Sequence, residues 1–260
     1  MRPMIPLSAV ALGLMMTCAA HADVQISSES INAGTGKTNS VNMYLAADRM
    51  KMDMGTTEMI YIDDIGTVYT VMKDRHQYMV LDPATQQRMA AMMSGMQDKL
   101  RQQMAAMPEA QRKQMEARGM GAAMQPKPDS AYVKTGEGKT VGSWSCQVFR
   151  KTLGSGSTID ACFAALSTVG LTQDDLAVLR KLAQRMQKTL PTAGAMGSMD
   201  FDRQTQEIGF EGFPVQTVTS MNGAPSTTST MTSVQHLTLP ADTFEVPAGY
   251  TRQEMPGLGK

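Results

Sequence analysis

Apolar and charged residues alternate strictly from residue 49 to residue 54, and this alternation constrains the fold more than any other feature of the chain. Side chains of a strand point to opposite faces with a period of two, so the pattern predicts a half-buried strand with Met50, Met52 and Met54 on one face. Further short apolar segments follow at residues 59–62, 67–71 and 78–81. Residues 23–82 are therefore predicted to form an antiparallel meander.

After Pro83 the spacing of apolar residues changes from two to an alternation of three and four. This spacing places them on one stripe of a helix. The stripe consists of Met89, Met93, Met96, Leu100, Met104 and Met107. Pro108 then opens a second short helical segment that ends at Gly119. Residues 84–124 are therefore predicted to form a Met-rich helical hairpin inserted into the sheet.

Strand-like segments resume after the predicted hairpin, at residues 131–133, 144–149, 158–163, 213–215, 230–239 and 244–247. One further helix interrupts them. Thr172 followed by two acidic residues is typical of a helix N-terminus. The helix then buries an apolar face formed by Leu176, Leu179, Leu182 and Met186 and ends near Pro191.

Residues 1–22 have the three-part order of a secretory signal peptide. Arg2 supplies a positive charge, residues 5–16 are apolar, and an Ala-x-Ala cleavage pattern ends at Ala22. The apolar run is shorter than the about 20 residues that a membrane-spanning helix needs. We expect export to the periplasm, with residues 23–260 forming a single mature domain that contains no transmembrane span.

Cys146 and Cys162 remain in the chain after Cys18 leaves with the signal peptide. An even pair of cysteines in an exported chain predicts a disulfide. The two cysteines flank a predicted hairpin turn at residues 154–157, which brings them near each other. We expect a slip or bulge in the register of this hairpin to align them.

The mature chain lacks a convincing catalytic constellation. His76 and His236 have no second His, Cys or Glu at the spacing of a zinc or hydrolytic site. Two Gly-Lys-Thr triplets lack the first glycine of a phosphate-binding loop. Lys plus Arg and Asp plus Glu both number 24, which argues against a nucleic-acid partner attracted by net charge. We therefore expect neither enzymatic activity nor nucleic-acid binding.

Methionine is unusually frequent, with 26 in the chain and nine of these between Met89 and Met124. Thioethers are soft ligands that suit Cu(I), adaptable contacts for varied apolar partners, and reversible acceptors of oxidant. Ordinary core packing is the remaining explanation. The spacing of the helical methionines suits a Cu(I) site or an oxidant buffer, which we retain as the alternative function. The residues concerned are Met89, Met92, Met93 and Met96.

Several short motifs together resemble an uncharacterised family of exported bacterial domains. They are residues 48–53, Tyr78, Gly142-x-Trp144-x-Cys146, residues 212–215 and Phe244-x-Val246-Pro247-x-Gly249-Tyr250. That family is similar in turn to the periplasmic lipoprotein carriers of the LolA/LolB type. The resemblance implies an incomplete antiparallel β-barrel whose concave apolar face is covered by helices, with lipid chains bound between sheet and helices.

The residue patterns and the resemblance predict the same mainly β (α+β) fold, a curved antiparallel sheet or half-barrel with helices on its concave face. We expect a cavity covered by the stripe of residues 89–107. Its predicted lining consists of Met50, Met52, Met54, Leu182 and Met186. The predicted function is non-enzymatic binding or chaperoning of a hydrophobic small molecule, lipid or lipoprotein in the periplasm. No cofactor is expected, except Cu(I) under the alternative.

Overall fold

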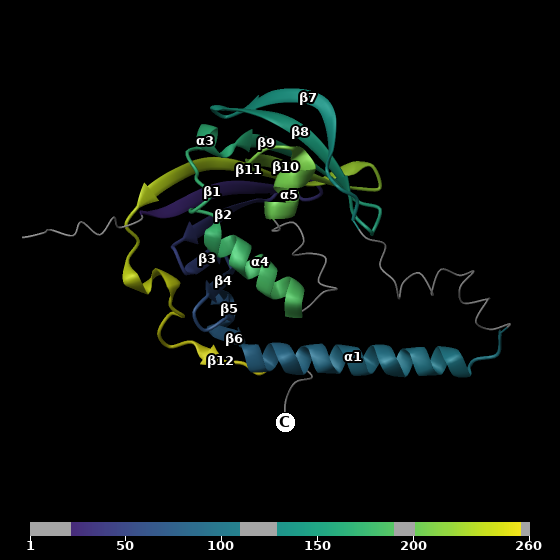
Figure 1. Ribbon diagram of the computed structural model, residues 1–260. Coiled ribbons are helices and arrows are strands. Elements are labelled where there is room, and N and C mark those ends of the chain that lie inside the picture. Colours follow the sequence, from purple (N-terminus) through teal and green to yellow (C-terminus); the bar gives the residue numbers. More distant parts are fainter. Residues whose placement is uncertain (1–21, 110–128, 190–200, 256–260) are drawn as a thin grey trace, which may run out of the picture.

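The computed structural model describes residues 22–109, 129–189 and 201–255, which form one curved sheet of 12 strands and a few helices (Figure 1). The order across the sheet is β12-β6-β5-β4-β3-β2-β1-β11-β10-β9-β8-β7. The sheet is not closed into a barrel, because β12 and β7 lie at opposite ends of this order. The strands are β1 (Asp23–Asn32), β2 (Thr38–Leu45), β3 (Arg49–Asp53), β4 (Thr57–Ile62), β5 (Thr67–Met72), β6 (Gln77–Leu81), β7 (Val133–Val141), β8 (Trp144–Thr152), β9 (Thr158–Ala165), β10 (Gly212–Met221), β11 (Ala224–Leu237) and β12 (Thr251–Arg252).

Strands β1 to β6 form the predicted antiparallel meander, in which each strand pairs with the next along the chain. The alternation in β3 sorts its side chains as expected. Met50 is buried beside its partner Tyr61 on one face, whereas Lys51 lies opposite Ile60 on the other. The predicted fold class is confirmed as a mainly β, curved and open sheet.

Strands β7 to β11 form a second antiparallel series, and β11 pairs with β1 to join the two halves into one sheet. The turn between β10 and β11 consists of Asn222 and Gly223. Both have positive φ values, of 53° and 80°, as the two-residue hairpin turn that suits the strand twist requires.

The described helices are α1 (Pro83–Ala106), α3 (Leu166–Val169), α4 (Ala177–Thr189) and α5 (Phe201–Ile208), with short 3₁₀ turns η1 (Lys73–Arg75) and η4 (Ala241–Phe244). The sheet curves around α4 (Figure 1). We call the face that packs against α4 the inner face. The apolar stripe of α4 was predicted correctly, since Leu179 and Leu182 are fully buried in the main core against this face.

Helix α1 differs from its predicted position. Only its first turns lie near β6 and α4, and the rest projects away from the sheet (Figure 1). The prediction that residues 89–107 cover the inner face is therefore wrong, because α4 already occupies that place. The second helix of the predicted hairpin falls almost entirely within residues 110–128, outside the described residues.

The C-terminal segment packs on the outer face of the sheet. Phe244 is buried there with Ile60 and Val71. The strand predicted for residues 244–247 is therefore wrong, because Phe244 ends η4 and turns into this cluster while Pro247 has no N–H for a ladder. The strand at this edge of the sheet is β12, which runs parallel to β6.

Candidate functional site

Three of the five residues predicted to line a cavity are part of the packed core. Met50 and Leu182 have no exposed surface, and Met186 is also buried. All three belong to one apolar cluster that joins α4 to the inner face of the sheet. These three side chains therefore pack against other apolar side chains of the protein itself.

Met52 lies in a row of methionines across the inner face. It pairs in register with Met43 of β2 on one side and with Met59 of β4 on the other. All three side chains are half-buried, and Met43 and Met59 pack against the main core. We call these three residues the methionine row. Met79 of β6 continues the line beyond Thr70, one strand further on.

The sequence predicted the inward direction of Met52 but not its neighbours in the methionine row. Each strand has a period of two, and the register between strands depends on the lengths of the connecting turns. The lengths of the turns that connect β2 to β3 and β3 to β4 are the sequence signal that could have placed Met43 and Met59 beside Met52. Met54, the fifth predicted lining residue, lies just beyond β3 and is exposed.

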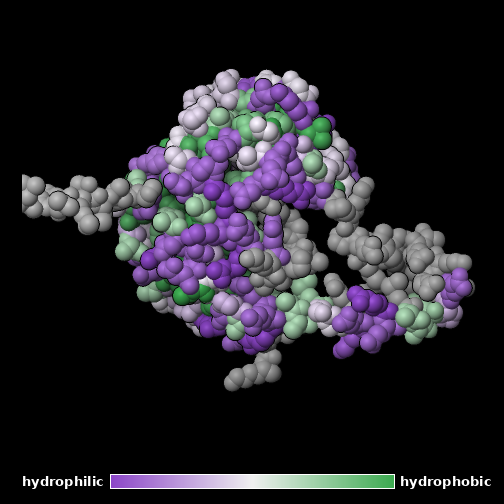
Figure 2. Space-filling model, viewed as in Figure 1, coloured by the Kyte–Doolittle hydropathy of each residue, from purple (hydrophilic) through white to green (hydrophobic). Residues whose placement is uncertain are grey.

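The predicted Cu(I)-binding methionines lie on α1, which we call the methionine arm. Met89 and Met93 are half-buried, whereas Met92 is 49% exposed and Met96 is 72% exposed. Figure 2 shows hydrophobic residues between hydrophilic ones along the projecting helix. Exposure of these two large apolar side chains distinguishes the arm from an ordinary core helix, which would bury them.

The base of the methionine arm is fixed to the sheet. The Asp82 carboxylate accepts a hydrogen bond of 2.7 Å from the backbone N–H of Thr85, which caps the first turn. The buried side chain of Gln86 donates to the carbonyl oxygens of Gly66 and Leu81, each at 3.2 Å. The arm therefore leaves the body at a defined position.

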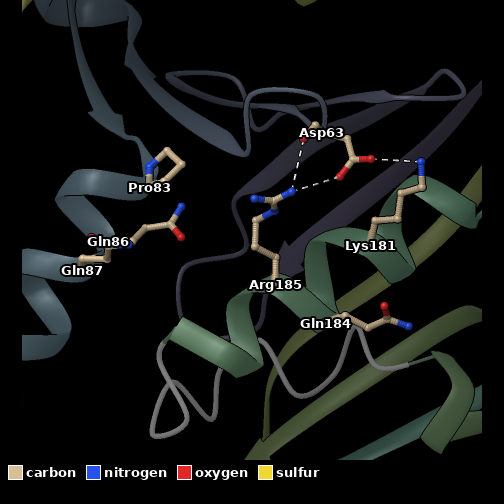
Figure 3. A pocket seen from close by; sticks show the side chains of 7 residues that line it. All are labelled: Asp63, Pro83, Gln86, Gln87, Lys181, Gln184 and Arg185. Carbon is tan, nitrogen blue, oxygen red and sulfur yellow. Dashed lines mark hydrogen bonds and ion pairs between the residues drawn. The ribbon is translucent and has the colours of Figure 1, made fainter.

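A polar pocket of about 520 Å³ lies where α1, α4 and the β4–β5 turn meet (Figure 3). Lys181 and Arg185 of α4 point toward Asp63 in that turn. The Lys181 Nζ lies 3.0 Å from Asp63 Oδ2, and the Arg185 Nη2 lies 3.7 Å from Oδ1. These ion pairs connect α4 to the sheet beside the arm.

The environment of Asp63 stabilises its charged form. Burial alone would raise the pKa of this carboxyl, but hydrogen bonds from Tyr61 and Lys181 and the charges of Lys181 and Arg185 outweigh burial and lower it. The Tyr61 hydroxyl donates to Asp63 at 2.6 Å. Burial, followed by this hydrogen bond to Asp63, raises the pKa of Tyr61 to about 12.

We expect Asp63 to make folding stability dependent on acid pH. The folded-state pKa is lowered, so the contribution is complete above the unfolded value of about 3.9 and is lost as pH falls through the folded value. Measuring the free energy of unfolding between pH 3 and pH 7 should show a steeper fall for the wild type than for Asp63→Asn. Equal slopes for the two proteins would contradict this role.

The predicted disulfide is confirmed between Cys146 of β8 and Cys162 of β9. The expected register slip is absent, because Cys162 pairs with Val148 in an unbroken ladder. The two cysteines are diagonal neighbours on the inner face, with Cα atoms 5.4 Å apart, so regular pairing already brings them together. Their sulfurs are buried in the main core.

Among the described residues, no three His, Cys, Asp or Glu side chains are grouped so that they could hold a metal ion. His76 is exposed in the turn after η1 and lies against the ring of Tyr250, with centroids 5.2 Å apart.

In residues 22–109, 129–189 and 201–255, no helix is long and apolar enough to span a membrane.

An open curved sheet with an amphipathic helix packed on its inner face defines a mainly β protein of α+β class. Residues 86–250 match the family DUF4412, a domain of unknown function. The chain belongs to this family. This agrees with the sequence motifs, which resemble those of an uncharacterised family. No functionally curated protein matches this chain.

Two solved structures can be superposed over most of the chain at low similarity. PNGF-II, in its P21 crystal form, is 9% identical with a TM-score of 0.38, and the match covers 89% of this chain but only 31% of PNGF-II. A DUF1329 family protein from Desulfovibrio piger is 11% identical with a TM-score of 0.24, and the match covers 88% of this chain and 91% of that protein. With these TM-scores, neither structure informs the function.

Proposed function

We propose that this protein is a non-enzymatic binding protein of the bacterial periplasm that holds a hydrophobic envelope partner, a lipid or lipoprotein, on its methionine arm. The signal-peptide pattern of residues 1–22 supports export, and a disulfide fits an oxidising compartment. The exposure of Met92 and Met96 on a projecting helix is the observation on which the proposal depends.

The arm has the length and chemistry of a contact surface. Its 24 residues correspond to about 36 Å at a rise of 1.5 Å per residue. Helices in proteins gain most of their stability from packing an apolar face against the rest of the protein. The projecting part of α1 carries exposed methionines, so a bound partner could bury this apolar surface. Methionine adapts to varied apolar partners because its side chain is flexible and polarizable.

The packed core between α4 and the sheet favours the arm over an enclosed cavity as the binding surface. A guest between α4 and the sheet would have to displace buried side chains such as Leu182 and Met50. A partner on the arm displaces only water. The LolA-like carrier role implied by the resemblance is therefore retained here as binding of an acylated partner, without the internal lipid cavity.

The arm can be tested with a diacylated lipopeptide of defined sequence as the probe. Burying a methionine contributes about 1.5–3 kcal/mol, so Met92→Ser combined with Met96→Ser should weaken binding by at least about tenfold in a calorimetric titration. Gln102→Ser combined with Gln103→Ser, at exposed positions of the same helix, is the matched control and should bind as the wild type does. Unchanged affinity in the methionine variant, or no binding by the wild type, would refute the proposal.

The same exposure favours a second candidate function, oxidant buffering. Susceptibility to sulfoxide formation follows the accessibility of the sulfur. We expect Met92 and Met96 to be oxidised by limiting peroxide before the buried Met50 and Met231, as measured by peptide mass spectrometry. Oxidation of all four at the same rate would show that the buried sites are open to solvent and would remove this candidate.

A further inference from the structure

We propose that the methionine row, Met43, Met52 and Met59, is a binding site for Cu(I) on the inner face of the sheet. This site is separate from the methionine arm and does not depend on the function proposed for the arm. It uses three strands, whereas the Cu(I) alternative suggested by sequence spacing used one helix.

Strand register brings the three thioethers together. Residues directly opposite each other on antiparallel strands have Cβ atoms about 4.5–5.5 Å apart. Met52 is opposite Met43 and also opposite Met59, so it has one methionine on each side. The methionine side chain has three rotatable bonds, which allows the two outer sulfurs to lean over the central one.

The residues around the methionine row are buried on one side of it and contain no further methionine directly beside it in the row. Leu45, Met50 and Tyr61 form the next row along the same three strands, and all are buried beneath α4. Within its own row, the methionine triad is bounded by Ile26 opposite Met43 and by Thr70 opposite Met59. The row therefore offers three adjacent thioethers, with no fourth directly beside them. Because these three form one ligand set, we expect a single ion per chain.

The chemistry of the row selects for a soft cation. Thioether sulfur is a soft, uncharged ligand that suits Cu(I), and carboxylate-preferring ions such as Mg²⁺ or Ca²⁺ find no charged oxygen among these three side chains. All three residues are half-buried, so part of each side chain is open to solvent while the surrounding apolar residues limit the competition from water. Thioethers do not titrate, so binding should not change between pH 5 and pH 8.

The site is tested by anaerobic titration of the disulfide-bonded protein with Cu(I) against a competing chelator, with Ag(I) as a redox-inert second probe. We expect one ion per chain. Met52→Leu, which nearly conserves side-chain volume, should weaken binding by at least about tenfold because it removes the central ligand. The triple Leu variant of the row should abolish the site while keeping the wild-type circular dichroism spectrum and unfolding midpoint.

Met92→Leu combined with Met96→Leu on the arm is the matched control. It should bind Cu(I) with wild-type stoichiometry and affinity. Loss of binding in this control with retention in Met52→Leu would assign the ion to the arm and overturn the proposal. Absence of stoichiometric binding by the wild type would also overturn it, whatever the result of the lipopeptide titration.

Discussion

Replacement of Leu182 by alanine is expected to lower the free energy of unfolding by about 2–5 kcal/mol. Leu182 has no exposed surface and packs from α4 into the main core on the inner face of the sheet. Truncation leaves a cavity at a site where the neighbouring strands are held in place by their ladders. Chemical denaturation followed by circular dichroism measures this loss directly.

Lys181→Ala provides the control on the same helix. Lys181 is about half-exposed, and the ion pair that it makes with Asp63 is worth about 0–1 kcal/mol. A loss of less than about 1 kcal/mol for Leu182→Ala as well would contradict the packed inner face. That result would instead support a loosely held α4, as an internal ligand cavity requires.

Loss of the disulfide is expected to lower the free energy of unfolding by about 3 kcal/mol, the chain-entropy value for a loop of about 15 residues. Cys146 and Cys162 are 16 residues apart in sequence and join β8 to β9 inside the main core. Cys146→Ala combined with Cys162→Ala leaves smaller apolar residues in this environment. Denaturation of wild type and variant, each with and without reductant, gives the measurement.

The variant should be insensitive to reductant, and the reduced wild type should approach the variant in stability. If reductant left the unfolding midpoint of the wild type unchanged, the covalent link would not be restricting the unfolded chain. The stabilising role assigned to the disulfide would then be wrong.

Sequence patterns predicted the elements better than their arrangement. The alternation around Met50 identified β3 and its buried face, because the period of two is a local property of the strand. The apolar spacing around Leu182 identified the buried face of α4 for the same reason. The two cysteines were paired correctly because they are the only two that remain once Cys18 is assigned to the predicted signal peptide.

The arrangement depends on contacts that no local pattern contains. The stripe on α1 has the spacing of a core-facing helix, but only one helix can fill a given part of the inner face, and α4 holds that place. Ion pairs from Lys181 and Arg185 to Asp63 join residues more than 100 positions apart in sequence. The methionine row depends on the register of three strands, which the turn lengths set.

The fold therefore separates two kinds of methionine. Those packed between α4 and the sheet, such as Met50 of β3 and Met186 of α4 itself, serve as core residues and account for part of the compositional excess. Those on the methionine arm and in the methionine row have exposed or half-buried side chains. The functional proposals concern only this second group, because an accessible thioether is what an apolar partner or a soft cation contacts.

Photocrosslinking from the arm in living cells tests the central claim most directly. A photoreactive amino acid in place of Met96 should give adducts that mass spectrometry identifies as lipid or lipoprotein, and the same group in place of Gln102 should give far fewer. Equal adducts from the two positions, or none from Met96, would contradict a partner-binding arm.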